Sequence, residues 1–161
     1  MDPPLEPITI VDWLRRFVVA AAAGAILGLP AQVKRRPGGI RTHALVSLGA
    51  AVFCMTAIAV VGTASEQLLR VIQGIASGIG FIGGAAVLRG DHIITGINTA
   101  ASIWISAAVG SAISFMRSPV LGILAAVVAT ILNWAFSELD LKLERRANEA
   151  TGEAAGPDRT G

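Results

Sequence analysis

The chain has 161 residues, of which 53% are hydrophobic and 15% are charged, whereas soluble domains are about 25% charged. With a mean hydropathy of +0.67, 18 glycines and no tyrosine, this composition excludes a soluble enzyme, a disulfide-stapled secreted domain and a disordered chain. The net charge of +2 does not indicate nucleic-acid binding, because the basic residues are dispersed and no aromatic residue interleaves them.

Five apolar stretches of roughly membrane-spanning length predict an all-α integral membrane protein, a bundle of about five transmembrane helices. We expect a flexible lead over residues 1–11, a transmembrane domain over 12–136, an amphipathic helical extension over 137–150 and a disordered tail over 151–161. The spans are expected at residues 12–29, 43–62, 71–88, 97–116 and 120–136.

Charged residues at both ends of the membrane domain favour helices. Asp12 precedes Arg15 and Arg16 by three and four residues, so the first helix should begin between Thr9 and Asp12. Beyond the last span, Glu138 and Lys142 stand at i, i+4 and predict a helix that continues into water.

The loop after the first span is the most basic segment, and basic loops stay cytoplasmic. It contains Lys34, Arg35, Arg36 and Arg41. Five spans then put the N-terminus outside and the C-terminus in the cytoplasm, with nine basic residues inside and four outside. A signal peptide cleaved near Ala31 is the alternative, but cleavage there would leave this basic loop at the translocated end.

Small residues at spacings of four let membrane helices approach closely. The third span is the richest in them and is therefore expected to pack centrally, with a glycine-lined path for an ion or ligand as the alternative. Its glycines are Gly74, Gly78, Gly80, Gly83 and Gly84. The first span offers Ala20, Gly24 and Gly28, and the fourth offers Ala107, Ala108 and Gly110.

A polar stripe runs along the fourth span, formed by Asn98, Thr99, Ser102 and Ser106. Buried amides and hydroxyls need hydrogen-bond partners, so the stripe predicts bonds across helices. The alternative is a cytoplasmic site in which Asp91, Asn98 and Thr95 meet a magnesium ion.

Several kinds of chemistry have no support in the sequence. No carboxylate lies in the middle of a span, which disfavours a coupled pump. His43 and His92 lack partners for zinc binding or catalysis, and Cys54 stands alone in an apolar run. We therefore expect no enzyme, no cofactor and no metal site.

Three blocks of sequence identify a family resemblance: PGGIRTHALV over 37–46, SGIGFIG over 77–83 and TGINTAASIW over 95–104. In this order they closely resemble the MgtC/SapB family of bacterial membrane proteins, over about residues 12 to 136. The matching positions are Arg41, Gly78, Gly80, Phe81, Gly83, Arg89, Gly96, Asn98, Thr99 and Trp104.

The resemblance implies a multi-pass protein of the bacterial inner membrane, in the short form without a C-terminal cytoplasmic domain. It also implies a link to growth in low magnesium and to survival inside host cells. Members resemble regulators that act on other membrane machines, notably ATP synthase and cation transporters.

The sequence departs from the family pattern at four places. Pro30-Ala31 replaces a Glu-Arg pair, Gly74 replaces a glutamine, Gly90 replaces an acidic residue and Ile105 replaces a cysteine. We expect these losses to be grouped at one membrane face, where they would alter a shared polar network.

The leading hypothesis is a non-enzymatic modulator of magnesium-linked ion homeostasis or stress adaptation that contacts a partner membrane protein. Lys34, Arg35 and Arg36 would meet anionic lipid or that partner. The other functional candidates are Arg41, Asn98, Thr99, Ser102, Arg89 and Asp91. The alternative is a small transporter or channel with a path between the third and fourth spans past Asn98, Ser102 and Ser106. Self-association into a homo-oligomer stays open.

Overall fold

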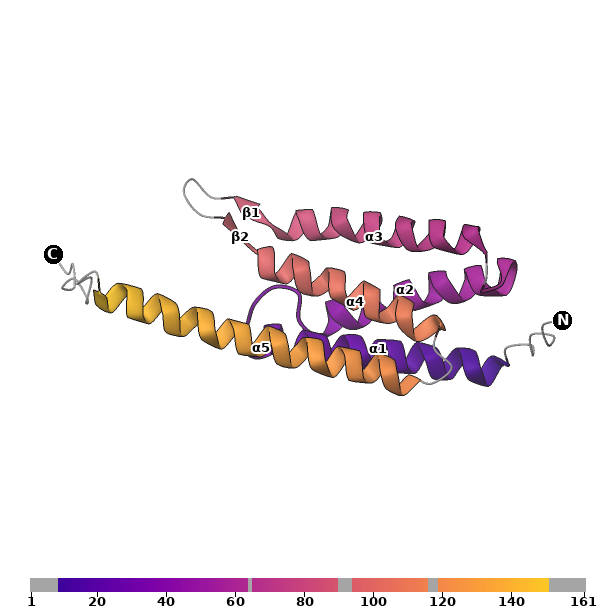
Figure 1. The fold of residues 1–161 in the computed structure, drawn as a ribbon, viewed down its shortest axis with the longest axis horizontal. Coiled ribbons are helices and arrows are strands. Elements are labelled where there is room, and N and C mark those ends of the chain that lie inside the picture. The colour runs from indigo at the N-terminus through magenta and orange to yellow at the C-terminus, as the bar shows by residue number, and fades with distance from the viewer. Residues whose placement is uncertain (1–8, 64, 90–93, 116–118, 151–161) are drawn as a thin grey trace.

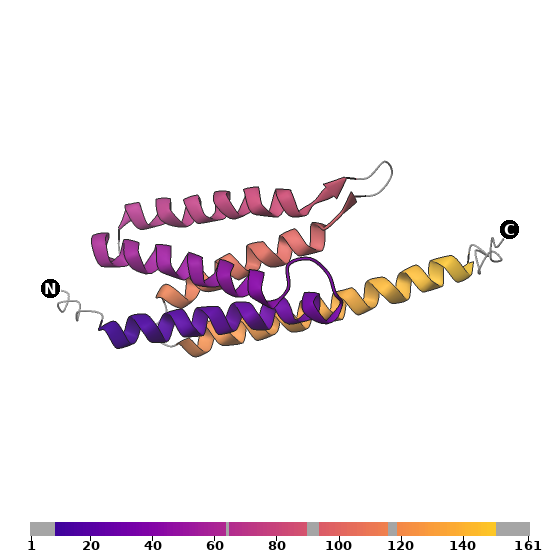
Figure 2. The same cartoon turned by 180° about the vertical axis from the view of Figure 1, so that it is seen from behind.

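The computed structural model describes residues 9–63, 65–89, 94–115 and 119–150 as a bundle of long helices (Figures 1 and 2). The elements are α1 (Ile10–Val33), α2 (Ile40–Val61), α3 (Glu66–Ala86), β1 (Leu88–Arg89), β2 (Ile94–Thr95), α4 (Ile97–Phe115) and α5 (Pro119–Ala150). The all-α prediction with five helices is confirmed. The two short strands were not expected, and they pair antiparallel with Leu88 opposite Thr95 and Arg89 opposite Ile94.

The first helix begins where the sequence predicts. Thr9 is its N-cap, and a capping box joins Thr9 and Asp12. The Asp12 carboxylate also lies 3.5 Å from the Arg15 guanidinium. The expected end at residue 29 is wrong, because α1 continues through Pro30 to Val33 and the Lys34 amide donates to the Pro30 carbonyl oxygen at 3.1 Å.

The third helix begins five residues before its expected start. Ser65 is the N-cap and accepts a hydrogen bond from the Gln67 amide, so Glu66, Gln67 and Arg70 belong to the helix and not to a connection. Hydropathy misses this first turn because its residues are polar, although the cap and Glu66 both stabilise a helix N-terminus.

Four helices, α1 to α4, are long and apolar enough to cross a membrane. The apolar part of α5 runs from Gly122 to Ala135, about 21 Å of helix against about 30 Å of hydrocarbon. Figures 1 and 2 show α5 lying alongside α1: α5 begins a short way in from the end of α1 that is near the N-terminus and extends past the opposite end of the bundle. The fifth helix thus traverses the bundle although its apolar stretch is shorter than expected.

The most buried helix is α4, not α3. Half of the apolar window of α4 is buried, against 11% of that of α3. The core lies where α1, α2, α4 and α5 meet and consists of Ala20, Ala23, Leu27, Ala51, Val109, Ile113 and Ala126. The expectation that the third span packs centrally is therefore wrong for the single chain.

Close approach of the helices occurs at glycines of α1 and α4. A Cβ on Gly24 would collide with the His43 carbonyl oxygen, and one on Gly110 would collide with that of Ser47. A Cβ on Gly28 would lie 2.7 Å from the Ile40 Cα. The Ser47 hydroxyl donates to the Ala20 carbonyl oxygen at 2.7 Å in this contact. The predicted small-residue packing is thus confirmed at Gly24, Gly28 and Gly110.

The glycines of α3 behave differently. A Cβ on Gly74, Gly78, Gly80 or Gly84 would meet nothing within 4 Å. Only Gly83 is buried, and its Cβ would lie 3.5 Å from that of Ala100 on α4. The other four helices form the core, so α3 packs against the bundle through one face only. Most of its glycines do not contact another helix.

Arg16 stabilises the far end of α4. Its guanidinium donates to the Ser114 carbonyl oxygen and, at 3.4 Å, to that of Ile113. These carbonyls belong to the last turn of α4, where the helix dipole favours a cation. Arg16 therefore joins two helices.

Candidate functional site

A polar cluster lies at the end of the bundle where the α1–α2 loop, the start of α4 and the middle of α5 meet. His43 is a fully buried member of this cluster, with no exposed surface. Its Nδ1 lies 3.0 Å from the Gly39 carbonyl oxygen, and its Nε2 lies 3.0 Å from the Ser102 hydroxyl oxygen. Since a carbonyl only accepts, Nδ1 carries a proton and donates to Gly39.

The Ser102 hydroxyl joins the histidine to α4. Its oxygen also lies 2.9 Å from the Thr99 carbonyl oxygen, and the Ser106 hydroxyl donates to the Ser102 carbonyl oxygen at 3.0 Å. Two members of the predicted polar stripe, Ser102 and Ser106, are therefore hydrogen-bonded, and the bond between Ser102 and His43 is the expected contact across helices.

The α1–α2 loop packs tightly on this cluster. Gly38 adopts a φ of +76°, in the left-handed region that favours glycine. A Cβ there would lie 2.9 Å from the Thr99 methyl group. Gly38 thus combines a required backbone conformation with a close approach to α4.

A polar hollow of about 20 Å³ opens beside the cluster. Its lining residues come from α1, the loop, α4 and α5: Pro30, Ala31, Lys34, Arg36, Asn98, Thr99, Ser102 and Asn133. A volume of about 10 to 15 Å³ on this measure holds one water, so the hollow accommodates one or two atoms of that size.

The charge at this hollow is positive. The Lys34 ammonium pairs with the Glu138 carboxylate at 3.3 Å, whereas the Arg36 guanidinium makes no ion pair within the described residues. No carboxylate is found among the described residues that line the hollow. The described residues contain no group of three or more metal-ligating His, Cys, Asp or Glu side chains.

The structure separates the other predicted site residues. Arg41 is exposed in the first turn of α2 and does not line the hollow. Arg35 is exposed, with a φ of 51°. Arg89 forms part of β1, its side chain is not described, and Asp91 lies outside the described residues. Asn98, Thr99 and Ser102 are brought together with Lys34 and Arg36.

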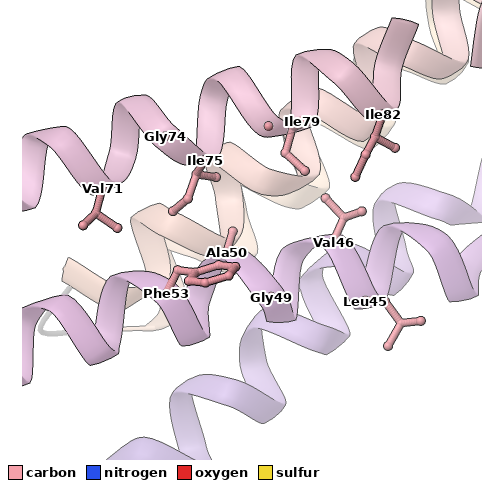
Figure 3. Close-up of a pocket in the computed structure, with 11 residues that line it drawn as sticks. Leu45, Val46, Gly49, Ala50, Phe53, Val71, Gly74, Ile75, Ile79 and Ile82 are labelled. Atoms are coloured by element: carbon pink, nitrogen blue, oxygen red, sulfur yellow. The ribbon is translucent and has the colours of Figure 1, made fainter. Parts of the chain in front are cut away.

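An apolar groove of about 640 Å³ lies between α2 and α3 (Figure 3). It is lined by Leu45, Val46, Gly49, Ala50, Phe53, Val71, Gly74, Ile75, Gly78, Ile79 and Ile82. A second hollow, of about 280 Å³, lies between α3 and α4 beside Trp104 and Ser111. Asn98, Ser102 and Ser106, expected to line an ion path there, line neither.

Sequence reasoning missed three residues of the site. His43 was set aside because no partner was visible, and its partner Ser102 stands 59 residues away. Asn133 lines the hollow, and its position as an amide in the apolar stretch of α5 was the sequence feature that could have indicated a buried polar site. Glu138 was expected to pair with Lys142, but its carboxylate lies beside Lys34.

Comparison with known proteins matches the MgtC family model to residues 17–141. The chain belongs to the MgtC family. Protein SrpB of Synechococcus elongatus is 39% identical over 117 residues, which cover 63% of this chain and 64% of SrpB. Protein MgtC of Salmonella typhimurium is 35% identical over 105 residues, covering 65% of this chain and 44% of that protein.

A further family relative is the putative magnesium transporter YhiD of Escherichia coli, 30% identical over 140 residues that cover 82% of this chain and 64% of YhiD. The chain thus spans less than two thirds of the length of these relatives. No solved structure matches it. Family membership and the apolar helices make it a multi-pass protein of the bacterial inner membrane.

The departures from the family pattern do not fall in one place. Pro30 and Ala31 line the polar hollow, whereas Gly74 lines the apolar groove. Gly74 stands 12 residues before the end of α3, about 18 Å along the helix. The expected grouping is therefore wrong for Gly74, and Gly90 lies outside the described residues.

Proposed function

We propose that this MgtC-family chain is a non-enzymatic modulator of magnesium-linked ion homeostasis or stress adaptation that acts by contacting a partner membrane protein. The names of two relatives, Protein MgtC and putative magnesium transporter YhiD, support the magnesium link. The observation that carries the contact mechanism is the open face of α3, which the rest of the bundle leaves without packing.

The open face of α3 has the properties of a helix-docking surface. In lipid, helices associate through close packing at small residues, since the hydrophobic effect gives no preference for protein over lipid. Gly74 and Gly78 line the α2–α3 groove, and Gly80 and Gly84 are exposed beyond it. Side chains of a partner helix would fill a groove of this size, with Phe53 at its wall (Figure 3).

Polar groups on α3 add to this surface. Gln73 and Ser77 are exposed in the same helix, and the Gln73 amide makes no hydrogen bond within the described residues. An amide without a partner is costly in hydrocarbon, so a contacting helix that bonds to it gains stability. ATP synthase and cation transporters are the partners that the family resemblance favours.

Growth across a magnesium series tests the proposal. A deletion strain would be complemented with the wild-type chain, with Gly78→Leu or with Ala125→Leu. Gly78 has open space around it and Ala125 is exposed on α5, so both variants should fold. We expect a defect confined to low magnesium that wild type and Ala125→Leu rescue and Gly78→Leu does not. Equal rescue by both variants contradicts a contact role for α3.

Ion flux in liposomes separates the proposal from the transporter alternative. The purified chain should show no magnesium or monovalent-cation flux above that of empty vesicles. Flux that Asn98→Leu abolishes would contradict the modulator and support a transporter or channel.

A further inference from the structure

We infer that the polar hollow binds one oxygen of an anionic phosphate group, such as that of an anionic lipid headgroup. The hollow lies between α1, the α1–α2 loop, α4 and α5 and is lined by Lys34, Arg36, Asn98 and Asn133 among others. This inference concerns the end of the bundle and does not rest on the partner contact proposed for α3.

The lining offers hydrogen-bond donors and no fixed negative charge. Lysine and arginine side chains only donate, and each asparagine amide adds two N–H donors. Among the described residues, no carboxylate is present in the lining. A phosphate oxygen is a strong acceptor, and bonds from cationic donors to it are about twice as strong as neutral ones.

Arg36 supplies the positive charge that a phosphate would neutralise. The Lys34 ammonium already faces the Glu138 carboxylate at 3.3 Å. The Arg36 guanidinium makes no hydrogen bond or ion pair within the described residues, although it lines the hollow. A guanidinium fork can donate two parallel bonds to one phosphate.

The start of α4 adds a second favourable field. Asn98 and Thr99 stand in the first turn of this 19-residue helix. The first N–H groups of any helix lack an acceptor within the helix, and the dipole there favours an anion. In this inference, the backbone N–H groups at the start of α4 would supplement the side-chain donors.

The size and level of the hollow limit the ligand. About 20 Å³ admits one phosphate oxygen and leaves the rest of the ligand outside the hollow. The apolar stretch of α5 ends at Ala135, two residues after Asn133, and α1 ends at Val33, next to Lys34. Both helices therefore leave the hydrocarbon here, at the level where lipid phosphates lie.

Native mass spectrometry of the full chain in detergent tests this inference. Phosphatidylglycerol would be titrated into wild type, Arg36→Gln, Asn133→Leu and Arg35→Gln. Arg35→Gln is the matched control, because Arg35 carries the same charge in the same loop but does not line the hollow. Far-UV circular dichroism and thermal unfolding would confirm that each variant is folded.

We expect Arg36→Gln to weaken the tightest bound phosphatidylglycerol about tenfold, as loss of one charge-assisted hydrogen bond predicts. Asn133→Leu should weaken it several-fold with no change in net charge, and Arg35→Gln should change it less than about twofold. Equal losses in Arg35→Gln and Arg36→Gln would overturn the inference, because they indicate attraction to the basic loop as a whole.

Two further experiments, competition with inorganic phosphate and binding of phosphatidylcholine, identify the source of the phosphate. Displacement of phosphatidylglycerol by millimolar inorganic phosphate, lost in Arg36→Gln, would support a free phosphate as the natural ligand. Retention of the lipid under the same conditions would support the headgroup. Binding of phosphatidylcholine as tightly as phosphatidylglycerol, unchanged in Arg36→Gln, would overturn an anion site.

Discussion

His43 of α2 and Ser102 of α4 are joined by a hydrogen bond of 3.0 Å between the imidazole Nε2 and the hydroxyl oxygen, inside the bundle. His43 thereby links α2 and α4 to the loop of the candidate site, since its other ring nitrogen donates to the Gly39 carbonyl oxygen. Removing one partner of such a buried hydrogen bond destabilises the protein, because the other polar group stays buried without a partner.

Replacement of Ser102 by alanine should therefore destabilise the protein. The His43 Nε2 would lose its partner in a site without exposed surface, at a cost of about 1 to 3 kcal/mol. Thermal unfolding in detergent measures the change. Ser106→Ala is the matched control, because within the described residues the Ser106 hydroxyl bonds only to a carbonyl of its own helix. Equal losses for both variants would contradict a special role for the His43 contact.

Substitution of two glycines by alanine should have different effects on stability, because one glycine lies at a close helix contact and the other on an open surface. Gly24→Ala places a methyl group against the His43 carbonyl oxygen and should cost about 1 to 3 kcal/mol or prevent folding. Gly80→Ala meets nothing within 4 Å and should be neutral or stabilising, since alanine favours a helix by about 1 kcal/mol over glycine. Yield of folded protein and thermal unfolding measure both. A harmless Gly24→Ala would contradict the α1–α2 packing.

Arg16 should contribute to the stability of α4. Arg16→Met removes the donor to the Ser114 and Ile113 carbonyl oxygens while it retains an unbranched side chain, and we expect a loss of about 1 to 2 kcal/mol. Arg15→Met is the control, because the Arg15 side chain is exposed and, among the described residues, pairs only with Asp12. Chemical unfolding would compare the two. A larger loss in Arg15→Met would refute the capping role.

The ion pair between Lys34 and Glu138 should contribute little energy on its own. The Glu138 side chain is 51% exposed, and pairs of this kind are worth about 0.2 to 1 kcal/mol. A double-mutant cycle with Lys34→Met and Glu138→Gln measures the coupling. Coupling well above 1 kcal/mol would show that the pair is shielded from water.

Much of the fold could be predicted from the sequence because it depends on local signals. The Thr9 cap with Asp12 located the start of α1, and apolar length located the other helices. Helix ends were less accurate, since Ser65 and Glu66 begin α3 with polar residues that hydropathy ignores.

The candidate site was predictable only in part. The polar stripe of α4 indicated hydrogen bonding, and Lys34 and Arg36 were recognised as one basic loop. Asn133 and His43 were missed because each looks isolated in its own segment. The partner of His43 is Ser102 of α4, and Asn133 shares the hollow with Lys34; both contacts join segments that are far apart in the sequence.

The sequence by itself determined the membrane class, the five helices and the family, because composition, apolar length and motif order are properties of the chain. Only the tertiary structure decided which small residues touch a neighbour. Gly24 and Gly110 meet the backbone of α2, whereas the denser glycines of α3 meet open space. The spacing of small residues shows that another helix can pack closely against this one. Which face of the helix is covered depends on how all the helices pack around the core.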